Sequence, residues 1–538
     1  MQKRIRALLA LTLALAALCG CSGSAGDWVL KLYPPKDQRI VDQQQSADEA
    51  PKQEIERTDV KTEVLSSVDS FGLAYQPDYG LHPYNCESLN NRVILSFLYE
   101  PLFAVTADYE AQPVLAEDYE VSDDGLTTTV HLRSGARFSD GTALRAEDVT
   151  ASLEASRGSE YYGTRLRNVT SIAAADEKTV VFTTGLAYEC LPLLLDVPIV
   201  KSGTLDFPYP VGTGPYRMRS TKELLRVKDW WQDTEPLVDF DTIVLTQVTT
   251  SADIRDNFEY EKVNMVLTDP NSSAFAGFHN DYELWLQPGT TMQYIGYNLT
   301  SDIFSNYGLR GAITYALDRE KLVTELMGGF AAAAVLPCAP DSRYYDAKLA
   351  ASFSYSPSRY YQQLESASVE DMDGDGVLDL YVPSLGYALP VEGSILVCSS
   401  NYARVQAADE LVRQLNALGF RLTLESLDYT EYKRRLLNND FDLYYGEVRL
   451  SPNFDLSAFF GATGTLNYGG LYDSTMMHLC AQALANSGNT YSLYKRLCER
   501  GYITPVLFKS CAVYTTRGAL SEPATHVDWF LPQQTSEE

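Results

Sequence analysis

The segment from Asp371 to Asp379 has the carboxylate spacing that comes closest to a metal site in this chain. Aspartates occupy positions 1, 3, 5 and 9 of the segment and a glycine occupies position 6, namely Asp371, Asp373, Asp375, Asp379 and Gly376. An EF-hand calcium loop has this spacing and ends in a bidentate glutamate at position 12. Here position 12 is Val382, and no pair of helices is evident around the segment. The sequence therefore leaves two interpretations, a structural turn and a weak calcium site.

Motifs for catalysis and for cofactors are absent from the sequence. The chain contains no GxSxG, HExxH, P-loop or Rossmann fingerprint. Its five histidines are scattered, and none stands at metal-ligand spacing from another histidine or a cysteine. We therefore expect no enzyme, no cofactor and no histidine-built metal site, and we predict a binding function.

The net charge of −28 excludes some partners. A nucleic-acid partner is not expected, because phosphate binding requires a basic surface. Broad adsorption to anionic lipid is disfavoured for the same reason. The acidic balance favours the solubility of an exported protein. A second interpretation is an acidic cleft that attracts cationic ligands.

Seven cysteines follow Cys21, and this odd number leaves at least one free thiol. Disulfides form in exported proteins. Cys480 and Cys498 are our first predicted pair, since both lie in neighbouring helical segments near the C-terminus. The alternative is a set of buried free thiols in a large core.

The segment from Leu132 to Leu153, LRSGARFSDGTALRAEDVTASL, is the best-defined local structure. Alternation across 128–133 predicts a half-buried strand, and Ser139-Asp140-Gly141 predicts a tight turn. Glu147 and Asp148 then favour the start of a helix, because carboxylates are stabilised at its N-terminus. The segment therefore reads as strand, turn and helix.

Strands and helices alternate through the rest of the chain. Strands are predicted near 71–75, 180–182, 243–248, 421–425 and 442–448, and helices at 89–99, 309–323, 404–418 and 429–437. A chain of 538 residues is too long for one core, so at least two α/β domains are expected.

The segment from Leu132 to Leu153 resembles the signature of the family-5 extracellular solute-binding proteins, the peptide and nickel receptors of ABC importers. Four further segments resemble that family in the expected order, and together they span roughly residues 68 to 530. They are Leu81-His82-Pro83, GTGPY at 212–216, LRGAITYALDREKLV at 309–323 and AADELVRQLNALGFRLTLE at 407–425.

The resemblance implies an α/β, two-lobed, periplasmic-binding-protein-like fold with an extra small domain, as in oligopeptide-binding proteins. Lobe I is expected to be discontinuous, the small domain to span 98–204 and lobe II to span 286–514. The segments assigned to lobe I are 65–97, 205–285 and 515–535. Hinge closure would trap the ligand between the lobes. A membrane permease and its ATPase would be the partners, and the receptor would be a monomer.

The N-terminus reads as a lipoprotein signal peptide over residues 1–21. A basic start and a short apolar run lead into Leu18-Cys19-Gly20-Cys21, which resembles a bacterial lipobox with Cys21 as the lipidated residue. The alternative is an ordinary secretory signal cleaved nearby. Residues 22–64 are polar and read as a flexible tether. With no later transmembrane run, we predict an extracytoplasmic receptor anchored to the cell membrane, at the cell surface or the periplasmic face.

Ligand contacts can be carried over only to a few positions. In this family a peptide is held as an added strand by backbone hydrogen bonds. The loop after the first strand matches a segment that faces the ligand, and Thr213 matches a loop at the lobe crossing. The predicted residues of the first loop are Tyr75, Gln76, Asp78 and Tyr79. The alternative for all five is an ordinary turn.

The strand at 442–448 departs from the family pattern. In the peptide receptors it leads into G-W-x-x-D, whose aspartate pairs with the peptide amine. Here the Trp position holds Glu447 and the Asp position holds Leu450. Glu447 would bind an amine, or Arg449 would bind a carboxylate through a bidentate contact. Arg404 is a weaker candidate near the same lobe, and a solvated strand end is the alternative for Glu447 and Arg449.

The function predicted from the sequence is that of a substrate-binding lipoprotein of an ABC importer, with peptides or peptide-like solutes as ligands. One alternative is a receptor for a metal chelate or a glycan. Another is a sensor lipoprotein that has lost transport. A hydrolase is least supported, because triad and metal motifs are missing.

Overall fold

The computed structural model describes residues 70–232, 237–272, 275, 277–279 and 281–520. The predicted signal peptide, Cys21 and the predicted tether lie outside the described residues, as does the end of the 515–535 segment. Among the described residues, no helix is long and apolar enough to cross a membrane.

The first large sheet has seven strands in the order β12-β22-β11-β1-β10-β9-β8. The strands are β1 (Phe71–Tyr75), β8 (Tyr216–Ser220), β9 (Glu223–Arg226), β10 (Thr242–Gln247), β11 (Met265–Thr268), β12 (Tyr282–Gln287) and β22 (Cys511–Thr516). The central strand β1 runs parallel to β10 and β11. Gly72 is required in β1, because a Cβ there would lie 2.1 Å from the Lys262 carbonyl oxygen.

Helices cover both faces of this sheet, so β1 is buried on both sides. Leu73 packs in a core with residues of α4 (Leu89–Leu98), whereas its neighbour Ala74 packs in another core with residues of α6 (Ser251–Glu259). Successive strand residues point to opposite faces, which explains why β1 is apolar throughout.

The second large sheet has six strands in the order β14-β21-β13-β20-β18-β19. They are β13 (Thr291–Tyr297), β14 (Ala331–Ala333), β18 (Glu392–Cys398), β19 (Arg421–Leu427), β20 (Leu443–Arg449) and β21 (Ile503–Lys509). One face carries α7 (Tyr307–Ala316), α8 (Arg319–Leu326) and α11 (Tyr402–Asn416). The other core contains residues of α12 (Tyr429–Leu437), α13 (Ser457–Phe460), α14 (Ser474–Ala485) and α15 (Thr490–Arg500).

Smaller sheets complete the described part. Strands β4 (Ala116–Val121), β5 (Thr127–Leu132), β7 (Thr179–Thr184) and β6 (Val169–Ala174) form an antiparallel sheet beside α5 (Ala146–Ser156). A second small sheet contains β15 (Val369–Glu370), β16 (Asp379–Val382) and β17 (Tyr387–Pro390), and it follows α9 (Ala347–Phe353) and α10 (Pro357–Ser366). Strands β2 (Phe103–Val105) and β3 (Ala111–Pro113) pair separately.

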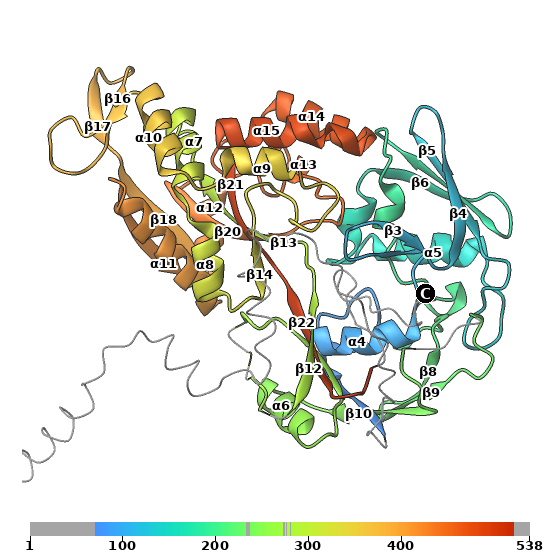
Figure 1. The fold of residues 1–538 in the computed structure, drawn as a ribbon. Coiled ribbons are helices and arrows are strands. Elements are labelled where there is room, and N and C mark those ends of the chain that lie inside the picture. The colour runs from blue at the N-terminus through green and yellow to red at the C-terminus, as the bar shows by residue number, and fades with distance from the viewer. Residues whose placement is uncertain (1–69, 233–236, 273–274, 276, 280, 521–538) are drawn as a thin grey trace, which may run out of the picture. The chain divides into compact units, whose positions relative to one another are not determined.

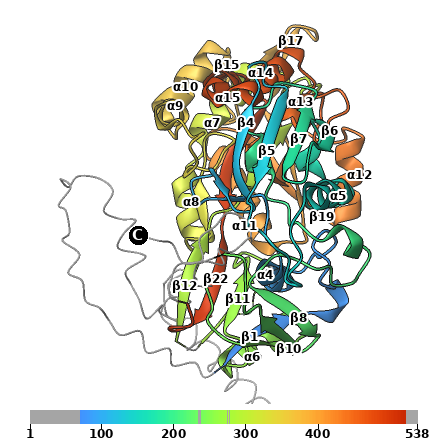
Figure 2. The same ribbon diagram turned by 90° about the vertical axis from the view of Figure 1, so that its right-hand side faces the viewer.

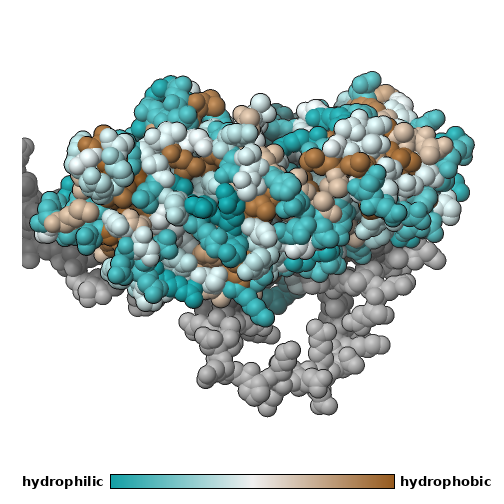
Figure 3. Space-filling view, turned by 90° about the horizontal axis from the view of Figure 1, so that it is seen from above, coloured by the Kyte–Doolittle hydropathy of each residue, from teal (hydrophilic) through white to brown (hydrophobic). Residues whose placement is uncertain are grey.

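The chain passes between the two large sheets twice, at 288–290 between β12 and β13 and at Ser510 between β21 and β22. Figure 1 shows β12 and β22 below β13 and β21. Figure 2 shows the first sheet at one end, with α10, α14 and α15 at the other. From above (Figure 3), small hydrophobic groups are separated by hydrophilic ones. Strand β22, which belongs to the first sheet, begins at Cys511, four residues before the predicted lobe I segment 515–535. The domain boundaries stay a prediction.

The predicted single helix over 309–323 is wrong, because the structure has two helices there. Leu317 leaves the helical conformation at the end of α7, with ψ of 115°. The Asp318 carboxylate then accepts a hydrogen bond of 3.0 Å from the Lys321 N–H and caps α8. Asp is a favourable N-cap residue, so it starts a new helix here instead of continuing the first.

The predicted disulfide between Cys480 and Cys498 is also wrong. All seven cysteines in the described part are free thiols. Cys480 on α14 and Cys498 on α15 are both buried, and the Cys498 thiol donates to the Val335 carbonyl at 3.8 Å. Burial raises the pKa of Cys498 to about 12. The buried-thiol interpretation therefore holds in this structure.

Candidate ligand-binding site

Four charged side chains of alternating sign meet where the chain crosses between the large sheets. Glu447 on β20 lies 3.6 Å from Arg404 of α11 and 3.5 Å from Lys509 at the end of β21, measured between carboxylate oxygens and side-chain nitrogens. Lys509 also forms an ion pair with Asp269, which follows β11. Since Asp269 directly follows a strand of the first sheet and Glu447 lies on a strand of the second, this charged chain joins the two.

The charged chain sets the titration of Glu447. Burial alone would raise the pKa of Glu447. The positive charges of Lys509 and Arg404, together with a 2.8 Å hydrogen bond donated by Gln293, outweigh burial and hold that pKa below its usual value. Burial would lower the pKa of Lys509, but Glu447 and Asp269 raise it overall. Glu447 is thus ionised and already engaged by two cations of its own chain.

Arg449 lies on one face of an aromatic ring from a different part of the chain. Its guanidinium carbon is 3.6 Å from the centre of the Tyr161 ring, and the guanidinium carbon of Arg92 on α4 is also 3.6 Å from that centre. Burial lowers the pKa of Arg92 to about 10, and the charge of Arg449 acts in the same direction. The contact draws together α4, β20 and the segment that precedes the 3-10 helix at Gly163–Leu166.

Buried polar groups without hydrogen-bond partners gather at the 288–290 crossing. Within the described residues, neither the nitrogen nor the oxygen of the Gln287 side-chain amide has a partner, and Gln287 is 0% exposed. The hydroxyl of Thr290 is also without a partner there, as is the Nε atom of Arg404 in the charged chain. The Thr290 backbone is fixed by a hydrogen bond from the Leu450 N–H at 3.0 Å. An unpaired buried group costs about 1–3 kcal/mol, so these groups are candidates for contact with a ligand.

A cavity of about 460 Å³ opens at the carboxyl ends of β1 and β11. Gln76 and Tyr79 from the loop after β1 line it, and Asp269 joins it to the charged chain. Ligands of open α/β sheets bind beyond the carboxyl ends of the strands. Asn90 of α4 also lines the cavity, is 9% exposed, and has a side-chain oxygen without a partner among the described residues.

The predicted site residues therefore fall into separate groups. Gln76 and Tyr79 share the cavity, and Arg404 and Glu447 share the charged chain, while Arg449 contacts Tyr161. The other three are placed elsewhere. Tyr75 is buried within β1, Asp78 is exposed, and Thr213 is buried with its carbonyl accepting a hydrogen bond from Trp230 at 3.0 Å.

Sequence reasoning missed the ion pair of Asp269 with Lys509 and the unpaired Gln287 and Thr290 beside the crossing. It also missed Asn90 in the cavity wall. One signal could have found Asp269, because an acidic residue that directly follows a buried strand and precedes proline stands at the edge where ligands bind. Gln287 and Lys509 gave no such signal, since their burial depends on how the two sheets meet.

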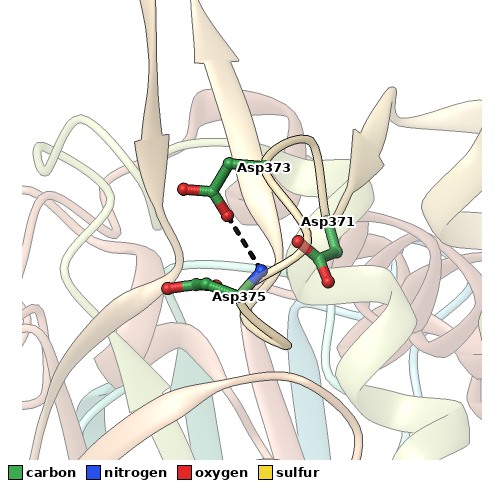
Figure 4. Close-up of side chains that lie close together, drawn as sticks. All are labelled: Asp371, Asp373 and Asp375. Carbon is green, nitrogen blue, oxygen red and sulfur yellow. Dashed lines mark hydrogen bonds between the residues drawn. The ribbon is translucent and has the colours of Figure 1, made fainter.

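The aspartate-rich loop between β15 and β16 has the hydrogen bonds of a turn. Carboxylate oxygens of Asp371, Asp373 and Asp375 lie within 4.8 Å of one another. Asp371 accepts the N–H groups of Gly374 and Gly376, and Asp373 accepts that of Asp375, which Figure 4 draws as a dashed line. Asp379 accepts the Met372 N–H, and Asp375 forms a 2.6 Å ion pair with Arg421. Each of these carboxylates is thus already bonded within the chain.

The family model of the bacterial extracellular solute-binding proteins, family 5 middle region, matches residues 110–467. The chain belongs to this family. Glutathione-binding protein GsiB of Salmonella typhi is 28% identical over 309 residues, which cover 54% of this chain and 60% of that protein. The match thus spans about three fifths of the length of this curated relative.

Solved structures of other binding proteins show the same fold. The unliganded open form of the periplasmic murein tripeptide binding protein MppA has a TM-score of 0.67 at 12% identity, covering 87% of this chain and 98% of that one. NikA from Brucella suis, in complex with Fe(III)-EDTA, has a TM-score of 0.63 at 18% identity, covering 84% and 98%. The predicted two-lobed α/β fold of a periplasmic binding protein is confirmed.

Proposed function

We propose that this family-5 protein is the substrate-binding component of an ABC importer, which captures peptides or peptide-like solutes between its lobes and delivers them to a membrane permease. The observation that carries the proposal is the fully buried amide of Gln287 and the buried hydroxyl of Thr290, which flank the 288–290 crossing and have no hydrogen-bond partner among the described residues. A side-chain amide both donates and accepts hydrogen bonds. A peptide backbone offers both functions to such a group, so the crossing suits a peptide ligand.

The ligands named for its relatives support this class of solute. GsiB is described as binding glutathione and MppA as binding a murein tripeptide, and both ligands are short and peptide-like. Binding needs no covalent step, so we propose a receptor without catalytic activity. Its anchoring through Cys21, its monomeric state and its permease and ATPase partners belong to the same proposal.

Ligand capture would use contacts that bridge the two sheets. The Asn401 side chain donates to the Asn271 carbonyl at 3.0 Å, and Lys509 pairs with Asp269. We use the term cleft for the proposed ligand site between the lobes that contain the two large sheets. Opening this cleft would break or stretch such contacts, with the two short crossings as the hinge. A bound ligand would restore closure and would satisfy Gln287 and Thr290.

A thermal-shift screen of the full-length protein tests the proposal. The library contains glutathione, peptides of two to five residues, a nickel chelate and an oligosaccharide, since a ligand specific to the folded state raises the midpoint of unfolding. We expect a rise with peptides that Gln287→Leu abolishes. The exposed Gln362→Leu is the matched control and should keep the rise.

The Leu variant also distinguishes a binding role from a folding role. Without ligand, Gln287→Leu should melt no lower than the parent protein, because it removes an unpaired buried amide. A rise with the chelate or the oligosaccharide and none with any peptide would refute the peptide proposal.

A further inference from the structure

Aromatic rings form part of the wall of the 460 Å³ cavity at the carboxyl ends of β1 and β11. Phe275 and Phe278 line it with their ring centres 6.0 Å apart, and Tyr79, which is half exposed, lines it from the loop after β1. Aromatic faces attract cations, and this attraction grows as water is excluded. The wall therefore suits an organic cation as well as an apolar group.

The polar part of the wall favours the cation. Glu87, an exposed residue just before α4, lines the cavity, and its carboxylate has no ion pair among the described residues. The helix N-terminus is already capped by Ser88, whose side chain accepts the Asn91 N–H at 3.1 Å. Glu87 is thus not needed as the cap, and its carboxylate is available to a ligand.

Asn90 supplies a second acceptor on the same wall. Its side-chain oxygen is buried and has no partner in the described part of the chain. Leaving a buried acceptor unpaired is costly. An ammonium or guanidinium group carries several donors and no acceptor, so it would satisfy Asn90 and Glu87 together.

The other charged residues of the cavity wall are each paired with a residue outside it. Arg255 lines the cavity, but its guanidinium donates to the Asp256 carboxylate at 3.0 and 2.8 Å. Asp269 lines the cavity and is paired with Lys509. The charge of Glu87 is the one left uncompensated in this set.

We propose that this cavity binds the positively charged side chain of the ligand, an ammonium or a guanidinium group. The inference rests on the proposed function and specifies its substrate class as peptides or peptide-like solutes that carry a cationic group. Asp269 belongs both to the cavity wall and to the charged chain, so the cavity adjoins the crossing where the backbone of the ligand is proposed to bind.

Calorimetry with three matched tripeptides tests this subsite on the full-length protein. The probes are Ala-Lys-Ala, Ala-norleucine-Ala, which replaces the ammonium with a methyl group, and Ala-Glu-Ala. We expect Ala-Lys-Ala to bind about tenfold more tightly than the norleucine peptide, from one charge-assisted hydrogen bond, and Ala-Glu-Ala to bind most weakly.

Two variants locate the effect. Glu87→Gln should remove most of the preference for lysine and leave the affinity for the norleucine peptide unchanged. The exposed Glu365→Gln on α10 makes the same change of charge elsewhere and should alter neither. Asn90→Leu should reduce the lysine preference without changing the circular dichroism spectrum.

The outcomes separate the subsite from the proposed function. Equal binding of the three peptides would overturn the cationic subsite and leave a peptide receptor. A lysine preference that persists in Glu87→Gln would overturn the assignment to this cavity. If none of the three peptides binds, both the subsite and the proposed peptide function fail.

Discussion

The carboxylate of Glu447 lies between two cations of its own chain, and each of these three side chains depends on the others. Lys509 is 3.5 Å away and Arg404 is 3.6 Å away, and the Glu447 side chain is 22% exposed. Removing one partner from a largely buried set leaves charges without compensation, which costs more than the same change at the surface.

The pH dependence of this set can be predicted. The pKa of Glu447 is lower in the folded chain than in the unfolded one, so its contribution to stability is present above the unfolded pKa and is lost as the pH falls through the folded pKa. We expect Glu447→Gln to lower the free energy of unfolding by about 2 kcal/mol at pH 7, and by much less below the folded pKa. Urea unfolding at both pH values measures this.

Glu325→Gln, at an exposed position of α8, is the control and should have little effect at either pH. A loss in Glu447→Gln that is the same at neutral and acidic pH would contradict the assigned titration.

The sequence predicted Glu447 and Arg404 as ligand-binding residues, which stays a prediction, but it did not reveal that the two side chains lie 3.6 Å apart. Glu447 stands where the family pattern has a tryptophan, which drew attention to it. The sequence left two interpretations, in which Glu447 binds a ligand amine or lies at a solvated strand end. Its actual partner Lys509 lies on β21, far along the chain and next to the second crossing. Sequence spacing cannot reveal such a pair, because three-dimensional pairing of β13 with both β20 and β21 brings it about.

At the scale of elements, local periodicity located some of the strands and helices, and fewer than half of those that the structure has. The helix expected at 429–437 is α12 with those bounds, and the strand expected at 71–75 is β1. The break between α7 and α8 was missed, since an apolar face continues across Asp318 in sequence while the aspartate caps a new helix. Capping competes with helix continuation here, and the apolar spacing does not show which prevails.

The aspartate-rich loop offers a prediction at this scale. The Asp371 carboxylate accepts hydrogen bonds from two backbone N–H groups at 2.7 and 3.0 Å, and Asp375 forms an ion pair with Arg421. We therefore expect no calorimetric heat with calcium up to about 1 mM, the range of weak extracellular sites. Asp371→Ala should lower the free energy of unfolding by about 1–2 kcal/mol, because two N–H groups lose their acceptor.

Asp341→Ala removes an exposed aspartate outside the loop and should be nearly neutral. Calcium binding that Asp371→Ala abolishes would instead establish the loop as a metal site.

At the scale of the whole molecule, the loops at the edges of the two large sheets touch in this structure through Asn401 and Asn271. Asn401 has two roles. Its side-chain oxygen caps α11 by accepting the Arg404 N–H at 2.9 Å, and its side-chain nitrogen donates to the Asn271 carbonyl at 3.0 Å. One substitution can separate these roles, because aspartate keeps the cap and loses the donor.

Asn401→Asp should therefore open the cleft without unfolding the protein. Losing one bridging hydrogen bond of about 1 kcal/mol shifts the balance between open and closed forms, and we expect affinity for a bound peptide to fall by about fivefold. Small-angle scattering of the ligand-free variant should give a larger radius of gyration, while its urea midpoint stays close to that of the parent protein.

Asn306→Asp is the matched control. The Asn306 side-chain oxygen caps α7 by accepting the Leu309 N–H at 3.0 Å, and within the described part of the chain its side chain makes no hydrogen bond to the first sheet. Both variants add one negative charge at a helix N-terminus, where the macrodipole favours it. If both variants lose affinity and expand, the added charge is the cause. A loss of affinity and an expansion confined to Asn401→Asp would instead trace to the bridge, which couples ligand binding to the approach of the two sheets.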